Sequence, residues 1–149
     1  MKPFVFGLEK VLGLREYYED EAKIELGRAV GILAELEARL RSLGEELARA
    51  EEAQFSPGNS ALVMQQYMRY LLRLENTKEQ LLEEAAIAEL KVEEARNAFL
   101  EASRERKVLD KVKEKRQKEY RKTVLAEETK MLDDISSGAR SRLNANGVS

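Results

Sequence analysis

Two rows of apolar residues run along the chain and are separated by one short polar break. In the second row the steps alternate between four and three residues, and ten of the eleven positions are apolar. Its members are Tyr67, Leu71, Leu74, Lys78, Leu81, Ala85, Ala88, Val92, Ala95, Phe99 and Ala102. An average step of about 3.5 residues is the coiled-coil period. The stretch from Ser60 to Ser137 also lacks proline and glycine, so we expect one helix over about residues 60–137.

An equivalent row precedes the break and runs from Leu8 to Ala50, with eleven of thirteen positions apolar. The exceptions are Arg15 and Glu19, which are four residues apart and therefore able to pair with each other. Because proline is tolerated in a first helical turn, this helix is expected to begin near Pro3 and to cover about residues 4–54. Five glycines fall within it, and each weakens a helix by roughly 1 kcal/mol relative to alanine. Packing against the second helix is therefore needed to hold it.

The break covers residues 55–60. Pro57 disfavours a helical Ser56, Gly58 permits a left-handed turn, and Asn59 or Ser60 can cap the following helix. Two long helices that each carry one apolar stripe and are joined by a short turn should fold back on each other. The pattern predicts an all-α fold, an antiparallel two-helix coiled-coil hairpin.

Counting outward from the turn predicts which residues face each other. Leu40 should lie opposite Leu74, Leu33 opposite Leu81, and Phe4 opposite about Asp110. The second helix then overhangs the first and is expected to end near residue 137, with Gly138 as its cap and 138–149 as a frayed tail. Residues 1–149 are thus expected to form a single domain with an overhanging second helix.

Composition excludes several classes of function. The chain has 149 residues, of which 36% are charged and 6% aromatic, and it contains no Cys and no His. The usual general base, a thiolate ligand and the commonest metal ligand are therefore missing. There is no phosphate-binding loop, and no apolar run approaches the roughly 20 residues of a membrane span. We expect no enzyme, no cofactor and no metal site, and a protein of the cytoplasm.

Charge is segregated along the chain. Residues 9–52 carry a net charge of −5, whereas residues 104–122 carry +6. Nucleic acid is the weakest candidate partner of this basic block, because Tyr120 is its only aromatic residue and the whole chain is acidic at −2. Direct membrane insertion is not expected either, since the block has no continuous apolar face. An acidic protein surface and a simply solvated helix remain as alternatives.

A second candidate surface lies at the start of the second helix. Apolar residues between Val63 and Leu74 go nearly all round the helix, which is more than one partner helix covers. Exposed apolar surface with Met and Tyr favours contact with another protein. The alternative is that Phe55 and the turn fold over this end of the hairpin and bury it.

Both ends of the chain resemble the flagellar FliJ family. Residues 4–16, FVFGLEKVLGLRE, are similar to the family's opening pattern, and residues 113–120, KEKRQKEY, with MLDDI at 131–135 and Arg140, resemble its close. The central QQY at 65–67 also occurs in the family, and the likeness extends over the whole chain and its hairpin organisation.

The resemblance implies a cytoplasmic component of the flagellar type III export apparatus, peripheral at the inner-membrane face of the basal body. Such proteins resemble the stalk (gamma) subunit of rotary F-type ATPases. Their termini enter the hexameric export ATPase and promote its assembly and activity, their hairpin meets the export gate protein in the membrane, and some hold export chaperones. Carried onto this chain, the ATPase-binding residues are Arg15, Glu16, Arg104, Lys107, Lys115, Arg116 and Glu119. The gate-binding residues are Tyr67, Leu71, Leu74 and Lys78, the last standing where the family has His.

The gate residues also belong to the predicted seam, and they cannot be both buried in the hairpin and offered to a gate. One resolution shifts the local seam to Val63, Tyr67, Tyr70, Leu74, Thr77 and Leu81, which frees Leu71 and Lys78.

Three further hypotheses stay open beside the monomeric stalk of a flagellum. They are a structural coiled-coil dimer pairing through residues 106–130, a prefoldin-like holdase, and the related stalk of a virulence injectisome.

Overall fold

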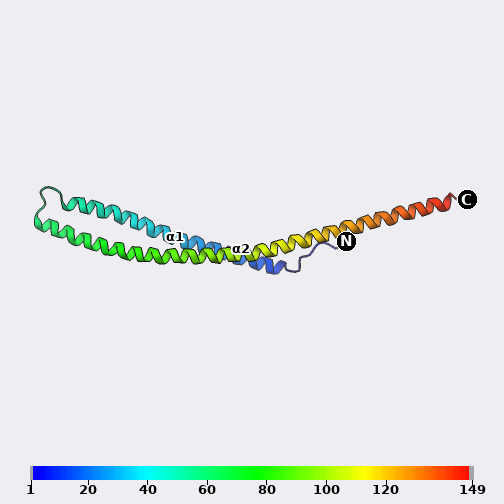
Figure 1. The fold of residues 1–149 in the computed structure, drawn as a ribbon, viewed down its shortest axis with the longest axis horizontal. Coiled ribbons are helices and arrows are strands. Elements are labelled where there is room, and N and C mark those ends of the chain that lie inside the picture. The colour runs from blue at the N-terminus through cyan, green and yellow to red at the C-terminus, as the bar shows by residue number, and fades with distance from the viewer. Residues whose placement is uncertain (1, 148–149) are drawn as a thin grey trace. The chain divides into compact units, whose positions relative to one another are not determined.

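The computed structural model describes residues 2–147, and over these residues the chain forms two α-helices and no strand. Helix α1 covers Glu9–Gln54 and helix α2 covers Ala61–Asn146 (Figure 1). The helices pack against each other as an antiparallel pair, which confirms the all-α hairpin.

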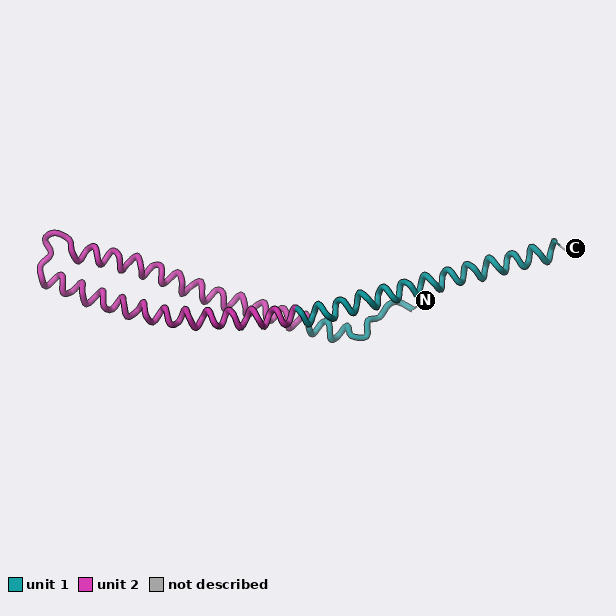
Figure 2. Tube along the Cα trace, in the orientation of Figure 1, with its two compact units in different colours: residues 1–15, 104–149 teal, residues 16–103 magenta. Residues whose placement is uncertain are grey.

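The chain divides into two compact units, coloured separately in Figure 2. Unit 1 consists of the described parts of Met1–Arg15 and Arg104–Ser149, and unit 2 of Glu16–Ser103. Unit 1 therefore contains the segment before α1, the start of α1 and the second part of α2, and unit 2 contains the rest of α1, the turn and the first part of α2.

The core of unit 2 is the expected seam. One cluster joins Leu43, Leu47 and Ala50 of α1 to Leu74 of α2, and the next joins Leu36 to the small side chains of Ala85 and Ala88. Burying a leucine side chain contributes roughly 1.5–3 kcal/mol, so a row of such contacts stabilises the pair without a globular core. Of the α2 seam positions, Lys78 is the one that is exposed.

The facing pairs expected from the count are reproduced only in part in unit 2. Leu40 was expected to face Leu74, but Leu74 lies in the cluster of Leu43, Leu47 and Ala50, whereas Leu40 packs against that of Leu36, Ala85 and Ala88. Leu33 and Leu81, which were expected to face each other, both pack against this second cluster. In unit 1, Phe4 was expected near Asp110, and its ring instead stacks on that of Tyr120. Both seams repeat every seven residues, so more than one alignment of the helices matches apolar to apolar, and the count from the turn does not choose among them.

The turn has the chemistry that its sequence predicts. Gly58 has a φ of 90°, the left-handed conformation that glycine adopts without steric cost. Ser60 Oγ accepts a hydrogen bond from the amide of Val63 at 3.3 Å and caps α2. The Asn59 side-chain amide donates to the carbonyl of Ala53 at 2.8 Å and to that of Gln54 at 3.2 Å, which closes the end of α1.

Both outer helix ends lie further along the chain than expected. Helix α1 begins at Glu9 rather than near Pro3, because Gly7 weakens a first turn and the irregular segment before it packs its phenylalanines against α2. Helix α2 runs through Gly138 to Asn146 and does not stop at Ser137. A single internal glycine costs about 1 kcal/mol, which is too little to end a helix when no proline follows. The role of Gly138 as a cap was therefore wrongly predicted.

Candidate functional site

In unit 1 the segment before α1 packs against one face of α2. Phe6 is only 5% exposed. The guanidinium of Arg116 lies 5.5 Å and the Lys113 ammonium 6.0 Å from the centroid of its ring, both within cation–π range. A buried aromatic side chain with two cations beside it thus anchors a segment that precedes the first helix.

Tyr120 anchors the beginning of the same segment. Its ring centroid lies 5.6 Å from that of Phe4, with the planes tilted by 50°. Its hydroxyl donates a hydrogen bond to the backbone carbonyl of Lys2. Tyr120 is thus half-buried and engaged within the chain, so it does not serve as a free stacking platform for a nucleic-acid base.

Ion pairs join the start of α1 to α2 within unit 1. Arg15 Nη1 lies 2.6 Å from Glu105 Oε2, and Lys113 Nζ lies 2.8 Å from Glu9 Oε2. Exposed pairs of this kind contribute about 0–1 kcal/mol each, so their main effect is on alignment. The sequence allowed a pair between Arg15 and Glu19; the contact of Arg15 across the helices was not foreseen.

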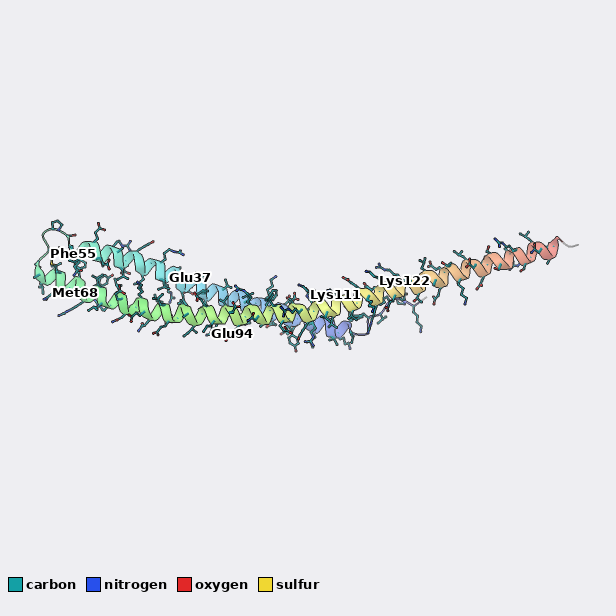
Figure 3. The ribbon with its side chains drawn as sticks, viewed as in Figure 1. Glu37, Phe55, Met68, Glu94, Lys111 and Lys122 are labelled. Atoms are coloured by element: carbon teal, nitrogen blue, oxygen red, sulfur yellow. The ribbon has the colours of Figure 1, made fainter. Side chains whose placement is uncertain are left out.

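A row of six cations occupies the other face of this part of α2. Their spacing of three or four residues places them along one side of the helix, and all six are exposed. They are Arg104, Lys107, Lys111, Lys115, Lys118 and Lys122. Figure 3 labels Lys111 and Lys122 on this stretch. The α2 residues that pack against the segment, such as Lys113 and Tyr120, lie on the opposite side, so the row stays open to solvent.

The predicted ATPase-binding residues therefore divide by environment. Lys107, Lys115 and Glu119 are exposed on α2, and Glu16 is exposed on α1. The remaining three residues interact with other residues of the chain. Arg15 pairs with Glu105, and the Arg116 guanidinium lies over the ring of Phe6.

Beyond Tyr120, α2 carries an apolar stripe that the sequence reading missed. Its large members are 63–72% exposed. They are Leu125, Met131, Leu132, Ile135 and Leu143. Four of these residues, Leu125, Leu132, Ile135 and Leu143, are spaced by seven, three and eight positions in the sequence. This spacing is out of phase with the seam and extends past the expected helix end.

The hairpin end of unit 2 exposes apolar side chains as well. Phe55, labelled with Met68 in Figure 3, is 74% exposed, so the turn does not fold over this end. Leu62, Met68 and Leu72 are 57–65% exposed. The alternative in which Phe55 and the turn bury this surface is therefore wrong, and an apolar patch of these side chains faces solvent.

The four predicted gate residues have different surroundings. Leu74 is buried in the cluster with Leu43, Leu47 and Ala50, and Leu71 packs against that cluster. Tyr67 is half-buried and Lys78 is exposed. The proposed shift of the seam was right to free Lys78.

The same shift was wrong in two respects. It freed Leu71, which in fact packs against the core, and it placed Thr77 in the seam. Thr77 is exposed, and its hydroxyl donates to the carbonyl of Arg73 at 3.0 Å.

Near this patch the Tyr70 hydroxyl donates a hydrogen bond to the carboxylate of Glu46 on α1. This bond, together with partial burial and the negative charge of Glu46, raises the pKa of Tyr70 above its ordinary value. The pair links the two helices close to the hairpin end through polar groups rather than through the seam.

Within residues 2–147, neither helix is long and apolar enough to cross a membrane. Over the same residues, no cluster of three or more acidic side chains is placed to hold a metal ion. The model of one protein family, described as the flagellar FliJ protein, matches residues 4–144 of the chain. No curated protein and no solved structure matches it.

Proposed function

Because the chain belongs to the flagellar FliJ family, and so to the proteins of flagellar export, we propose that it is the stalk of the hexameric export ATPase. In this function the chain acts by binding, not by catalysis. One copy enters the ATPase ring with its terminal end, promotes assembly and turnover of the ring, and presents its hairpin end to the export gate.

The observation that carries this proposal is the state of α2 beyond the N-terminal segment. From Arg121 to Asn146 every residue except Val124 and Gly138 is exposed, so this end of α2 buries almost none of its side chains within unit 1. Most of the stability of a helix in a protein comes from packing against other elements. The exposed end of the 86-residue helix α2 has little of this packing, so it would be stabilised by contacts inside another protein. The N-terminal segment packs on α2 just before this exposed end, through Phe6 and through the contact of Phe4 with Tyr120.

The exposed members of the predicted set are the best candidates for contact with the ring. Lys107 and Lys115 belong to the cation row, and Glu119 and Glu16 are also open to solvent. A row of cations favours a partner surface that is rich in acidic groups and accelerates the encounter of the two proteins. Arg15 and Arg116 then act indirectly, by holding the N-terminal segment against α2.

The hairpin end is the candidate surface for the gate. Lys78 and the exposed edge of Tyr67 remain available there, and the neighbouring apolar patch of Phe55, Met68 and Leu72 adds area that a binding partner would bury. Leu74 contributes as a core residue that supports this surface. The same patch is the place where export chaperones would bind, at the cytoplasmic side of the flagellar base.

The decisive test adds the purified chain to the purified export ATPase and measures ring formation by light scattering and turnover by phosphate release. We expect both to increase. A double variant, Lys107→Glu with Lys115→Glu, should keep its helical circular dichroism and lose most of the stimulation, because it reverses two exposed charges without touching the packed face.

Lys23→Glu is the matched control, since it reverses an exposed lysine of unit 2. An unchanged turnover at stoichiometric amounts of the unaltered chain would rule out the stalk function. A holdase of the prefoldin kind would instead assemble into multi-armed oligomers and suppress aggregation of unfolded protein without affecting the ATPase.

A further inference from the structure

The apolar stripe of α2 beyond Tyr120 has a self-complementary arrangement. The exposed side chains of Leu125, Leu132, Ile135 and Leu143 lie on one face of the helix. Exposed apolar residues gathered in this way mark an interaction surface more often than scattered ones do. The face covers about 27 Å of helix from Leu125 to Leu143.

Two charged residues fall on the same face at symmetric positions. Glu128 and Arg142 each lie seven residues from Ile135, on either side of it, and both are exposed. If two copies of this helix lie antiparallel with Ile135 at the two-fold axis, Glu128 of each copy faces Arg142 of the other. In a parallel pair Glu128 would face Glu128 and Arg142 would face Arg142, which is unfavourable.

The same axis matches side-chain sizes. Met131 then lies opposite Ala139, and Leu132 lies opposite Gly138, so these two large side chains each meet a small one and the helix axes can approach closely. These pairings repeat twice by symmetry, as in any isologous interface. The charge and the size pattern thus select the same antiparallel arrangement independently.

We propose that two copies of the chain pair antiparallel through this stripe when the end of α2 is not bound elsewhere. The interface is short and belongs to the small, reversible class that buries less than about 1,200 Å² in total, so the pair forms at high concentration and the monomer dominates on dilution. The proposal is independent of the stalk function. If the stalk function holds, the ring and the second copy compete for the same helix end.

Sedimentation velocity at rising protein concentration tests the pairing. We expect the mass to increase from that of one chain to that of two. Glu128→Arg alone and Arg142→Glu alone should each weaken the dimer at least tenfold, because each places like charges opposite one another. The double variant exchanges the two charges and should restore the dimer. A monomer at every concentration, or a double variant as weak as the single ones, would overturn the proposal.

Disulfide trapping tests the direction of the pair, and it is straightforward because the chain has no cysteine. Ile135→Cys lies at the axis and should form a disulfide-linked dimer under oxidation. Leu125→Cys should not, since its two copies lie far apart in an antiparallel pair. Cross-linking at both positions would indicate a parallel pair and contradict the proposal.

Leu90→Cys is the matched control for random collision, since Leu90 is 67% exposed in unit 2. Helical circular dichroism of each variant confirms that the chain remains folded. Two measurements on the unaltered chain separate the proposals: sedimentation velocity without the ATPase reports the dimer, and phosphate release with the ATPase reports the stalk function, so that either can fail while the other holds.

Discussion

The rings of Phe4 and Tyr120 lie 5.6 Å apart, centroid to centroid, although 116 positions separate them in the sequence. This contact shows how a segment without regular secondary structure is held on α2. Aromatic pairs in this geometry contribute about 0.5–1.5 kcal/mol beyond the area they bury. Together with the burial of Phe6, the contact defines the base from which the bare end of α2 extends.

Phe6→Ala should detach the N-terminal segment. Replacing a buried phenylalanine by alanine costs about 3–5 kcal/mol in a protein core. Here we expect the loss to fall on residues 2–8 rather than on the whole chain, because this segment has no other buried side chain. Hydrogen exchange followed by mass spectrometry should show faster exchange of these amides.

Val5→Ala is the control for this experiment, because Val5 is 80% exposed and its truncation should leave the exchange unchanged. Equal exchange in the Phe6 variant and the unaltered chain would mean that Phe6 is not the anchor.

Glycine substitutions should have opposite effects at two positions. Gly58→Ala forces an alanine into φ of 90° and should lower the free energy of unfolding by about 1–2 kcal/mol. Gly44→Ala should raise it by about 0.5–1 kcal/mol, because the added methyl group meets nothing within 4 Å and alanine favours the helix. Thermal melts followed by circular dichroism measure both. A stabilising Gly58→Ala would disprove the left-handed turn.

Leu74 and Lys78 should separate structural from binding roles at the hairpin end. Leu74→Ala removes a buried side chain and should destabilise unit 2 by about 2 kcal/mol or more. Lys78→Ala should leave the melting temperature within about 2 °C, since surface changes usually stay within ±0.5 kcal/mol. We expect Lys78→Ala to weaken binding to the purified gate domain, measured by calorimetry. Full binding with a lowered melting temperature would assign Lys78 to the fold instead.

The hydrogen bond between Tyr70 and Glu46 predicts a dependence of stability on alkaline pH. The bond raises the pKa of Tyr70 above its ordinary value of 10.0, so the folded chain holds this proton more tightly than the unfolded chain. The contribution to stability is fully present below the unfolded pKa and is lost as the pH rises through the raised pKa. Urea titrations above pH 10 should therefore show a smaller loss of stability in Tyr70→Phe than in the unaltered chain. Identical slopes would exclude this linkage.

The period of the apolar residues was enough to predict which side chains lie between the helices. All thirteen positions of the row from Leu8 to Ala50 are buried or half-buried, and so are ten of the eleven from Tyr67 to Ala102. The turn residues Gly58 and Ser60 were also predictable, since their chemistry is local. These features depend on neighbours within a few residues, which is the range that a sequence pattern records.

The candidate site was only partly predictable. Exposure of Lys107, Lys115 and Glu119 follows from their position off the seam, but the contacts of Arg15 with Glu105 and of Arg116 with Phe6 join residues about 90 and 110 positions apart. The stripe from Leu125 to Leu143 does not stand out in the sequence, because it is out of phase with the row from Tyr67 to Ala102 that packs against α1.

By itself, the sequence determined the two helices, the side chains on the face that each helix packs with, and the turn, because periodicity and capping are local properties of the chain. Only the tertiary structure decided the register, since both seams repeat every seven residues and more than one alignment matches apolar to apolar. It also decided that Leu74 is core while Lys78 is surface, and that Phe6 leaves the helical path to pack on α2. These outcomes depend on contacts between residues far apart in the sequence, and the free energy of each contact depends on the side chains packed around it.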